Sequence, residues 1–358
     1  MTISSKTFEN RRENLRKLMH ENDLDSLLVA HAANRFYLSG FELHDPQCNE
    51  SAGWLLVNKN GDDRLLTDPR YLEAARRIWD EDRIFIYTSP KWDNIRGYLK
   101  DAASGEIGFE SDALTFSAHR ELSRELGLRP ITGLTESLRL VKDEEEIKLI
   151  RASCELNHKV MRQIEPLIVP GATEAELAWE IEKLFRTQGA SELAFDSIVA
   201  VGPNAALPHA APGHDRVAED ECVLVDVGGR MNDYCSDQTR TFWVGANPPD
   251  RFKRTLALVR EAQSKAIAGI RPGVEVSDAY ATARQCFEKY GVAEHFTHGL
   301  GHGVGLETHE RPSLSPSGQG ELAPGMIVTV EPGLYYPEWG GVRWEFMILV
   351  TEEGCEVL

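Results

Sequence analysis

The N-terminal part of the chain alternates between amphipathic and apolar segments. Apolar residues recur at helical spacing among the charges of residues 7–22, which predicts an amphipathic helix with one packed face. Short apolar runs between helical stretches follow and predict strands. These runs cover residues 26–30, 53–57, 64–67, 83–87 and 106–109. Strands alternating with helices are typical of an α/β domain, which we place at residues 1–140.

The second part of the chain begins with helix signals. Asp143 and Glu146 have the spacing of a capping box and precede a long amphipathic pattern. We therefore expect a long helix, and a second domain at residues 141–358, to start there. Thr173 and Glu176 repeat the spacing and predict another helix.

Two more helices are expected in this part of the chain. Pro249 is a candidate start for one, and residues 277–290 predict the other, which ends at Gly291. The remainder, from Ser197 onward, is predicted to consist mainly of strands and turns.

Composition excludes several functions. A length of 358 residues favours two domains, and a formal net charge of −18 leaves no basic footprint for nucleic acid or an anionic membrane. The charged N-terminus lacks the apolar core of a signal peptide, and no stretch approaches the roughly 18 apolar residues of a membrane span. The six cysteines form no CxxC pair and indicate free thiols. We expect the protein to stay in the cytoplasm.

Two segments share one plan: an apolar strand ending in an acid, a Gly-rich turn, and a return strand with a second acid. One segment runs from Asp226 to Asp237 and the other from Glu331 to Glu345. Each turn would bring its two acids side by side, and like charges so close require a cation. Either a salt-bridged structural network or a divalent metal would supply it.

The residues nearby favour the metal. The candidate cations of a salt-bridged network are few (Arg230, Arg240 and Arg343). The segment between the two acid pairs supplies the imidazoles of His298, His302 and His309, and one of them would complete a ligand set. The glycines beside His302 allow a close approach of the backbone.

Other chemistries fit this segment poorly. His298 and His302 have the zincin spacing, but alternating glycines oppose the helix that a zincin needs. The glycines do not follow the GxGxxG pattern of a nucleotide-binding loop, and no helix clearly follows them. A nucleophilic triad lacks a GxSxG elbow, and Cys235 is equally well a buried residue. Metal-dependent hydrolysis is the better account.

The chain resembles the prolidase and aminopeptidase P family of pita-bread metallopeptidases over nearly its whole length. The motifs that carry the resemblance are Asn204 with Pro208-His209 and Pro212, Asp226-Val-Gly228, residues 236–241, residues 298–305, His309-Glu-Arg-Pro312, Glu331-Pro-Gly333 and residues 342–345, with residues 34–41, 67–71, 107–110 and 138–143 in the first domain. It implies an α+β fold, with an N-terminal α/β creatinase-like domain followed by a pita-bread metallopeptidase domain.

The resemblance implies that two divalent ions share five ligands. Asp226 would bind one ion, and His302 and Glu331 would bind the other. Asp237 and Glu345 would bridge the pair. Four carboxylates and one imidazole suit Mn²⁺, with Co²⁺, Zn²⁺ or Fe²⁺ as alternatives.

The same resemblance implies an Xaa-Pro aminopeptidase or dipeptidase, commonly a homodimer, that acts on proline-containing peptides. A metal-bridging hydroxide would attack the scissile carbonyl, and Glu331 would carry a proton to the leaving nitrogen. His309 would hydrogen-bond the carbonyl oxygen or the oxyanion, while His209, His298 and Arg343 would line the substrate site. These four residues also have a plainer reading as supports of the ligands.

Two positions depart from the family pattern. Phe346 follows Glu345 where an acid is usual, which alters the surroundings of that ligand. Ser313 stands four residues after His309, where dipeptide-cleaving prolidases often have an arginine that holds the proline carboxylate. Arg311 is two residues out of that register, so a preference for dipeptides does not follow.

Two alternatives share the fold. One is a metal-free, creatinase-like hydrolase, and the other is a non-catalytic peptide-binding module. Either should have lost several of the five ligands, and all five are present in this sequence.

Overall fold

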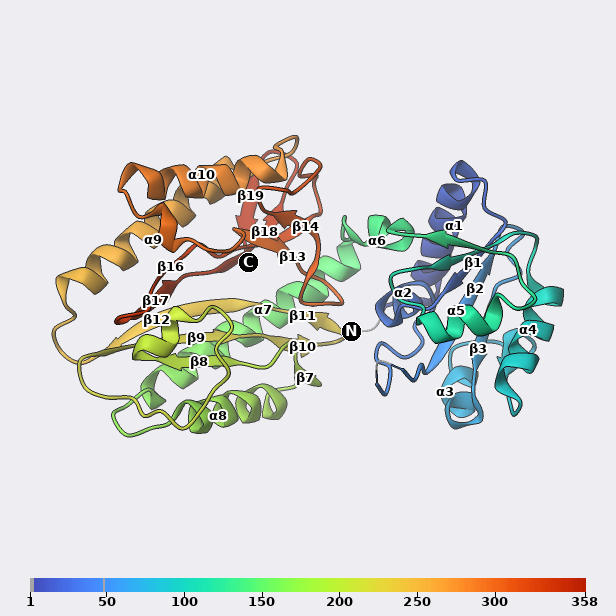
Figure 1. Cartoon of the computed structure of the whole chain (residues 1–358), viewed down its shortest axis with the longest axis horizontal. Coiled ribbons are helices and arrows are strands. Elements are labelled where there is room, and N and C mark those ends of the chain that lie inside the picture. The colour runs from blue at the N-terminus through green and yellow to red at the C-terminus, as the bar shows by residue number, and fades with distance from the viewer. Residues whose placement is uncertain (1–2, 48) are drawn as a thin grey trace. The chain divides into compact units, whose positions relative to one another are not determined.

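The computed structural model of the chain describes residues 3–47 and 49–358, which form two compact units (Figure 1). One unit ends at Arg139, and the other comprises Leu140–Leu358. Within the described ranges, no helix combines the length and the apolar character that crossing a membrane requires.

A mixed sheet forms the centre of the N-terminal unit. Over residues 3–47 and 49–139 its strand order is β4-β3-β2-β1-β5-β6, with β1, β5 and β6 parallel. The strands are β1 (Ser26–Val29), β2 (Gly53–Asn58), β3 (Arg64–Thr67), β4 (Ile84–Ile86), β5 (Ile107–Glu110) and β6 (Leu128–Ile131). The helices are α1 (Ser5–Glu21), α2 (Ala32–Ser39), α3 (Leu72–Arg76), α4 (Lys91–Ala102), α5 (Phe116–Leu122) and α6 (Leu134–Arg139). These elements confirm the predicted first helix and the five predicted strands.

A buried carboxylate joins this sheet to α2. Glu110 ends β5, and its Oε2 accepts hydrogen bonds from the backbone N–H groups of Ala30 and His31 at 2.8 and 2.7 Å. Its Oε1 accepts a third from the Asn34 amide at 2.7 Å. Three hydrogen-bond donors around the carboxylate explain why an acid is tolerated in this buried position.

Four long helices belong to the C-terminal unit. They are α7 (Glu144–Ile164), α8 (Glu174–Thr187), α9 (Asp250–Gly269) and α10 (Val276–Lys289). Both predicted capping boxes are present, at Asp143 with Glu146 and at Thr173 with Glu176. Pro249 is the N-cap of α9, and Gly291, with a φ of 65°, follows the end of α10.

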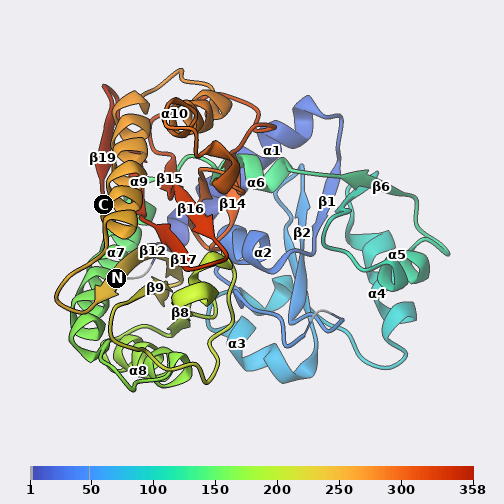
Figure 2. The same cartoon turned by 60° about the vertical axis from the view of Figure 1, so that its left-hand side comes forward.

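The strands of this unit form several small sheets. Over residues 140–358 the orders are β11-β10-β7, β12-β9-β8, β14-β13-β15-β18-β19 and β16-β17. The strands are β7 (Glu192–Leu193), β8 (Ile198–Val201), β9 (Glu221–Val227), β10 (Gly229–Met231), β11 (Tyr234–Cys235), β12 (Gln238–Val244), β13 (Gly301–Gly303), β14 (Glu310–Leu314), β15 (Ile327–Val330), β16 (Gly333–Tyr336), β17 (Gly340–Arg343), β18 (Phe346–Val350) and β19 (Cys355–Val357). Helix α8 packs against β8, α10 against β14, and α9 against β15, β16 and β17 (Figures 1 and 2).

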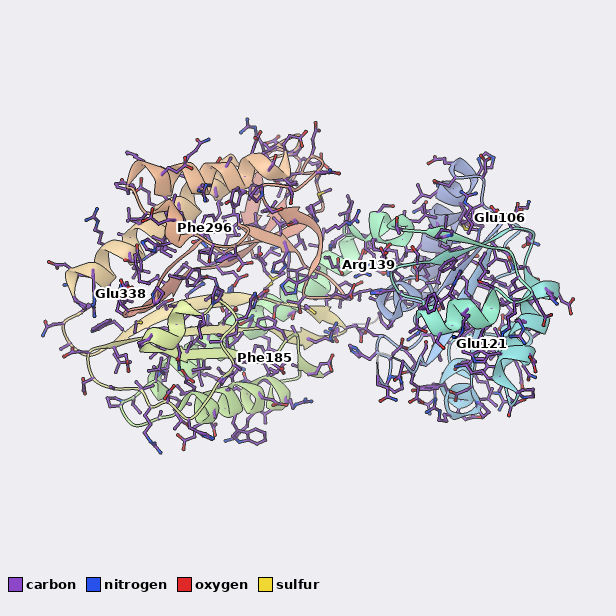
Figure 3. The ribbon with its side chains drawn as sticks, viewed as in Figure 1. Glu106, Glu121, Arg139, Phe185, Phe296 and Glu338 are labelled. Atoms are coloured by element: carbon purple, nitrogen blue, oxygen red, sulfur yellow. The ribbon has the colours of Figure 1, made fainter. Side chains whose placement is uncertain are left out.

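Two apolar clusters hold the helices on the strands. Phe185 of α8 lies between that helix and the strands (Figure 3), and a Cβ on Gly229 of β10 would overlap its ring. Glycine at position 229 therefore lets α8 approach the sheet closely. Phe296 belongs to the second cluster, where it stacks against Tyr280 of α10.

The N-cap of α8 is expected to contribute measurably to stability. Thr173 Oγ1 accepts a hydrogen bond from the Glu176 N–H at 3.1 Å. Replacing Thr173 with Ala removes this acceptor and should lower the free energy of unfolding by about 1 kcal/mol. Thr187→Ala, at the other end of the same helix, is the matched control and should change it by less than about 0.5 kcal/mol. Chemical denaturation measures both, and equal losses would contradict the capping role.

Candidate metal centre

All nine residues named as ligands or substrate contacts line one cavity of the C-terminal unit. Its volume is about 660 Å³. The nine residues are Asp226, Asp237, His302, Glu331, Glu345, His209, His298, His309 and Arg343. The four acids and His302 lie in three regions of the chain. Strand pairing brings these three regions together at the cavity.

The first pair of acids comes from β9 and the start of β12. These strands are antiparallel, with Asp226 opposite Thr239 and Val227 opposite Gln238. Asp237 directly precedes β12 and is buried. The chain between the two acids forms β10 and β11, so the segment is longer than a simple hairpin.

The second pair of acids continues the pairing of β15 with β18. Val330 is opposite Phe346 in this antiparallel ladder, so Glu331 and Glu345 are the next residues along the two strands. Thr239 joins the two acid-bearing segments, because its hydroxyl donates to Glu345 Oε2 at 2.7 Å. Its carbonyl oxygen also accepts from the Glu345 N–H at 3.2 Å.

His302 lies on β13, between β14 and β15. Its Nδ1 is 3.1 Å from the carbonyl oxygen of Gly303, which favours the tautomer with the proton on Nδ1. Nε2 then faces the acids, 3.3 Å from Glu331 Oε1 and 3.7 Å from Asp237 Oδ2. An imidazole held in this way presents a lone pair to a cation.

The glycines beside His302 serve the packing of strands. A Cβ on Gly301 would overlap the carbonyl oxygen of Thr329, and one on Gly303 would overlap that of Arg311. The close approach that these glycines allow is therefore to the neighbouring strands β15 and β14. It places His302 deep enough to reach the acids.

The cluster carries more negative charge than the protein balances. Burial, with the charges of Glu345 and Asp226, raises the pKa of Asp237 well above its usual range. Burial, with the charges of Glu331 and Asp226, does the same to the pKa of Glu345. Although burial opposes it, a hydrogen bond from the His302 ring, in the protonated form that it takes without a cation, lowers the pKa of Glu331 to about 2. Such opposed shifts are typical of carboxylates that share one buried site.

The donor atoms fit a divalent cation. One ligand atom from each of Asp237, His302 and Glu345 lies within 4.8 Å of the others. Asp226 Oδ1 and Glu345 Oε1 are buried and accept no hydrogen bond from any residue in the described ranges. An unpartnered buried carboxylate oxygen is costly unless a cation binds it, and hard oxygen donors with one imidazole suit Mn²⁺ and related ions.

A salt-bridged network accounts for only part of this charge. Arg343 Nη2 donates to Asp226 Oδ2 at 2.6 Å, and its Nε is 3.9 Å from Glu331 Oε2. Arg230 instead pairs with Glu192 at 2.6 Å, and Arg240 contacts Glu345 through its backbone oxygen and not through its carboxylate. One guanidinium cannot neutralise four carboxylates, so the arrangement favours metal binding.

A chain of hydrogen bonds orders the substrate side of the cavity. Arg343 Nη1 donates to the Tyr335 hydroxyl at 2.9 Å, and this hydroxyl is 2.8 Å from His298 Nε2. His298 Nδ1 is 2.6 Å from the carbonyl oxygen of Gly299, so Nδ1 carries the proton and Nε2 accepts from Tyr335. Sequence reasoning did not single out Tyr335, and it included Thr239 only as part of the motif of residues 236–241.

The remaining residues singled out in the sequence lie nearby with different exposure. His309 and His209 are exposed at the cavity, and the rings of His309 and His302 have centroids 4.2 Å apart. Ser313 also lines the cavity and pairs with His302 in the β13–β14 ladder. Cys235 is buried, and burial raises the pKa of its thiol to about 11, which argues against a nucleophilic role.

Two family matches divide the chain. Residues 148–352 match metallopeptidase family M24, and residues 11–141 match the creatinase/prolidase N-terminal domain. The chain is 35% identical to the Xaa-Pro dipeptidase of Pyrococcus furiosus over 353 residues, which cover 97% of each chain.

Solved structures extend this likeness to the fold. The Xaa-Pro dipeptidase of Bacillus anthracis superimposes with a TM-score of 0.91 at 35% identity, covering 98% of this chain and 97% of that one. The X-Pro aminopeptidase of Thermotoga maritima gives a TM-score of 0.87 at 31% identity, covering 97% and 96%. These likenesses confirm the predicted α+β fold, with a creatinase-like domain followed by a pita-bread domain.

The close packing of β13 gives a test of how His302 is positioned. Gly301→Ala forces a Cβ onto a backbone oxygen of β15, which cannot move aside as a side chain would. We expect the variant to lose about 1–3 kcal/mol of unfolding free energy. Gly299→Ala, whose Cβ would lie 3.3 Å from the Leu314 oxygen, is the milder control. Equal stability of the two variants in denaturant titrations would contradict the packing argument.

Proposed function

The chain belongs to metallopeptidase family M24, and from that premise we propose that it hydrolyses Xaa-Pro peptide bonds with two divalent metal ions. The observation that carries the proposal is the convergence of Asp237, His302 and Glu345, with donor atoms within 4.8 Å of one another. The names of its relatives in Pyrococcus furiosus and Bacillus anthracis support the choice of substrate.

We assign three of the five ligands to one ion each and the other two to both ions. Asp226 would hold one ion, while His302 and Glu331 would hold the other. Asp237 and Glu345, whose pKa values are raised by burial and by the charges of neighbouring carboxylates, would be shared by the two ions. Mn²⁺ is the proposed metal because oxygen donors outnumber the single nitrogen. We further propose that the protein is located in the cytoplasm and forms a homodimer.

The bound ions would supply a water of lowered pKa and polarise the scissile carbonyl. Glu331 would receive the proton of the attacking water at Oε2, since its Oε1 is already close to Thr329 and His302. It would then pass the proton to the leaving prolyl nitrogen. That nitrogen needs protonation because a dialkylamide is a poor leaving group.

The other polar groups would position the peptide. His309, exposed beside the His302 ring, would donate to the carbonyl oxygen as it gains charge. The Arg343–Tyr335–His298 chain would keep the wall of the cavity rigid. Proline fixes φ and removes the N–H that other peptidases read, so a shaped pocket must replace that hydrogen bond.

Metal removal and one ligand variant test this function together. Chelation of the wild-type protein should abolish Xaa-Pro hydrolysis, and added Mn²⁺ should restore it. Asp237→Ala should lose both ions and the activity, while its unfolding free energy stays within about 1 kcal/mol of the metal-free wild type, because one repelling charge is gone. Metal analysis, peptide assays and denaturation measure these outcomes.

Asp196→Ala is the matched control for this test. Asp196 is an exposed acid that lines the same cavity without belonging to the ligand set. Its variant should retain both ions. Activity that survives chelation would indicate a creatinase-like hydrolase, and a metal-loaded protein without hydrolysis would indicate a peptide-binding module. Two ions retained in Asp237→Ala would refute the bridging role.

Substrate length should depend on Ser313. This residue lines the cavity and offers no cation for the carboxylate of a C-terminal proline. The Mn²⁺-loaded enzyme should therefore cleave longer Xaa-Pro-Xaa peptides as well as Gly-Pro or Met-Pro. Ser313→Arg should shift the ratio of kcat/KM toward dipeptides by about tenfold, the effect of one charge-assisted hydrogen bond. Cleavage of dipeptides alone by the wild type would contradict this prediction.

A further inference from the structure

A second cavity lies on the other side of β12 from the metal centre. Its volume is about 550 Å³, and it is lined by residues of α7, β12 and α9 together with Trp344. In Figure 2, α9 and α7 run along one side of the C-terminal unit, next to β12. We call this cavity the arginine groove. Its polar lining is formed by His158, Arg162, Glu165, Gln238, Arg240, Thr241 and Trp243.

Strand alternation separates the groove from the metal centre. Successive side chains of a strand point to opposite faces. Thr239 therefore points toward Glu345, to which it donates at 2.7 Å, and Arg240 points into the groove. The same alternation places Trp344 on the groove side of the segment that carries Arg343. The groove is thus separate from the peptidase cavity and does not depend on the proposed peptidase activity.

Arg240 is only partly engaged by the protein. Its Nη1 donates to the backbone oxygens of Thr239 and Glu345 at 2.7 and 2.6 Å. The rings of Trp344 and Phe346 lie 4.6 and 4.5 Å from its Cζ. Nε and Nη2 make no hydrogen bond within the described ranges and are not fully buried. This edge of the guanidinium can therefore bind an anion in bidentate fashion.

Phe346 explains why Arg240 lacks an acidic partner. Its ring lies at contact distance from the guanidinium, so an acid at this position would pair with Arg240. With phenylalanine there, the charge has aromatic neighbours that fix its plane but do not neutralise it.

Two more arginines add unbalanced charge at the groove. Arg162 lines it from α7, and Arg260 of α9 places its Cζ 5.2 Å from the Trp344 ring. Arg162, Arg240 and Arg260 form no ion pair with any carboxylate among residues 3–47 and 49–358. Arg162 and Arg260 are exposed. In a chain with 57 acidic and 39 basic side chains, these three arginines give the surface at and beside the groove a local excess of positive charge.

One buried polar group close to Arg240 is also unsatisfied. Gln238 lies two residues before Arg240, on the same face of β12, and lines the groove. Gln238 is 5% exposed, and its Oε1 has no hydrogen-bond partner in the described part of the chain. Reversing the amide turns its NH₂ to the same place, so Gln238 can donate. An unsatisfied buried polar group at a cavity favours a ligand that forms hydrogen bonds.

We propose that the arginine groove binds the carboxylate or phosphate group of a small molecule. Arg240 provides the fixed bidentate edge, and Arg162 and Arg260 supply further positive charge. Glu165, the one acid that lines this cavity within the described residues, does not offset Arg162 and Arg240, which also line it.

The test is a titration of the metal-loaded, full-length protein with sodium phosphate, sodium acetate or sodium chloride at constant ionic strength. Calorimetry should show saturable binding of phosphate or acetate that exceeds that of chloride. The double variant Arg162→Gln/Arg260→Gln should weaken this binding about tenfold, since each charge-assisted contact contributes on this scale. Which anion binds more tightly identifies the ligand as a phosphate or a carboxylate.

A second double variant serves as the matched control for this experiment. Lys159→Gln/Lys253→Gln also removes one charge from α7 and one from α9, at exposed positions outside the groove. It should bind the anion within about twofold of the wild type. Gln is nearly as good a helix former as Arg or Lys, so all variants should fold. Three outcomes would overturn the proposal: equal weakening in both double variants, binding no better than that of chloride in the wild type, or unchanged affinity in Arg162→Gln/Arg260→Gln, which would place the anion at the metal centre instead.

Discussion

The C-terminal unit is organised around buried negative charge that its own residues do not balance. Four carboxylates converge from β9, the start of β12, the end of β15 and the start of β18. Arg343 pairs with one of them, and His302 lies 3.3 Å from another. An excess of this size in a buried site destabilises the fold unless a cation enters it. The proposed metals, the raised pKa values of Asp237 and Glu345, and the unpartnered oxygens all follow from this constraint.

Strand pairing brings the carboxylates and His302 together around the site where a cation would bind. Glycines let the strands that carry them approach one another. Gly301 and Gly303 allow β13 to lie against the backbones of β15 and β14, which places the His302 ring beside the acids. Thr239 joins the two acid-bearing segments through its hydroxyl and its carbonyl oxygen. Because these contacts hold the ligands in place before a cation arrives, metal binding would require little rearrangement.

Successive side chains of β12 point to opposite faces, so this strand contributes to two different sites. Thr239 serves the acid cluster, and its neighbour Arg240 faces the arginine groove on the opposite side. Arg240 also holds the backbone oxygen of Glu345 at 2.6 Å. An anion in the groove and a cation in the metal centre would therefore bind to opposite faces of the same short segment.

Much of this arrangement followed from local sequence patterns. The first helix, five of the six strands of the N-terminal unit and both capping boxes were predicted, because periodicity and capping depend on residues a few positions apart. The acid pairs and the His302 segment were also recognisable, since each consists of polar residues set in an apolar or glycine-rich strand. Other features depended on contacts between distant residues. Tyr335 orients His298, Thr239 joins the two acid pairs, and Arg240 lacks an acidic partner because Phe346 lies beside it. Pairing across the fold decides such contacts, and no local pattern in the sequence records which strands will meet.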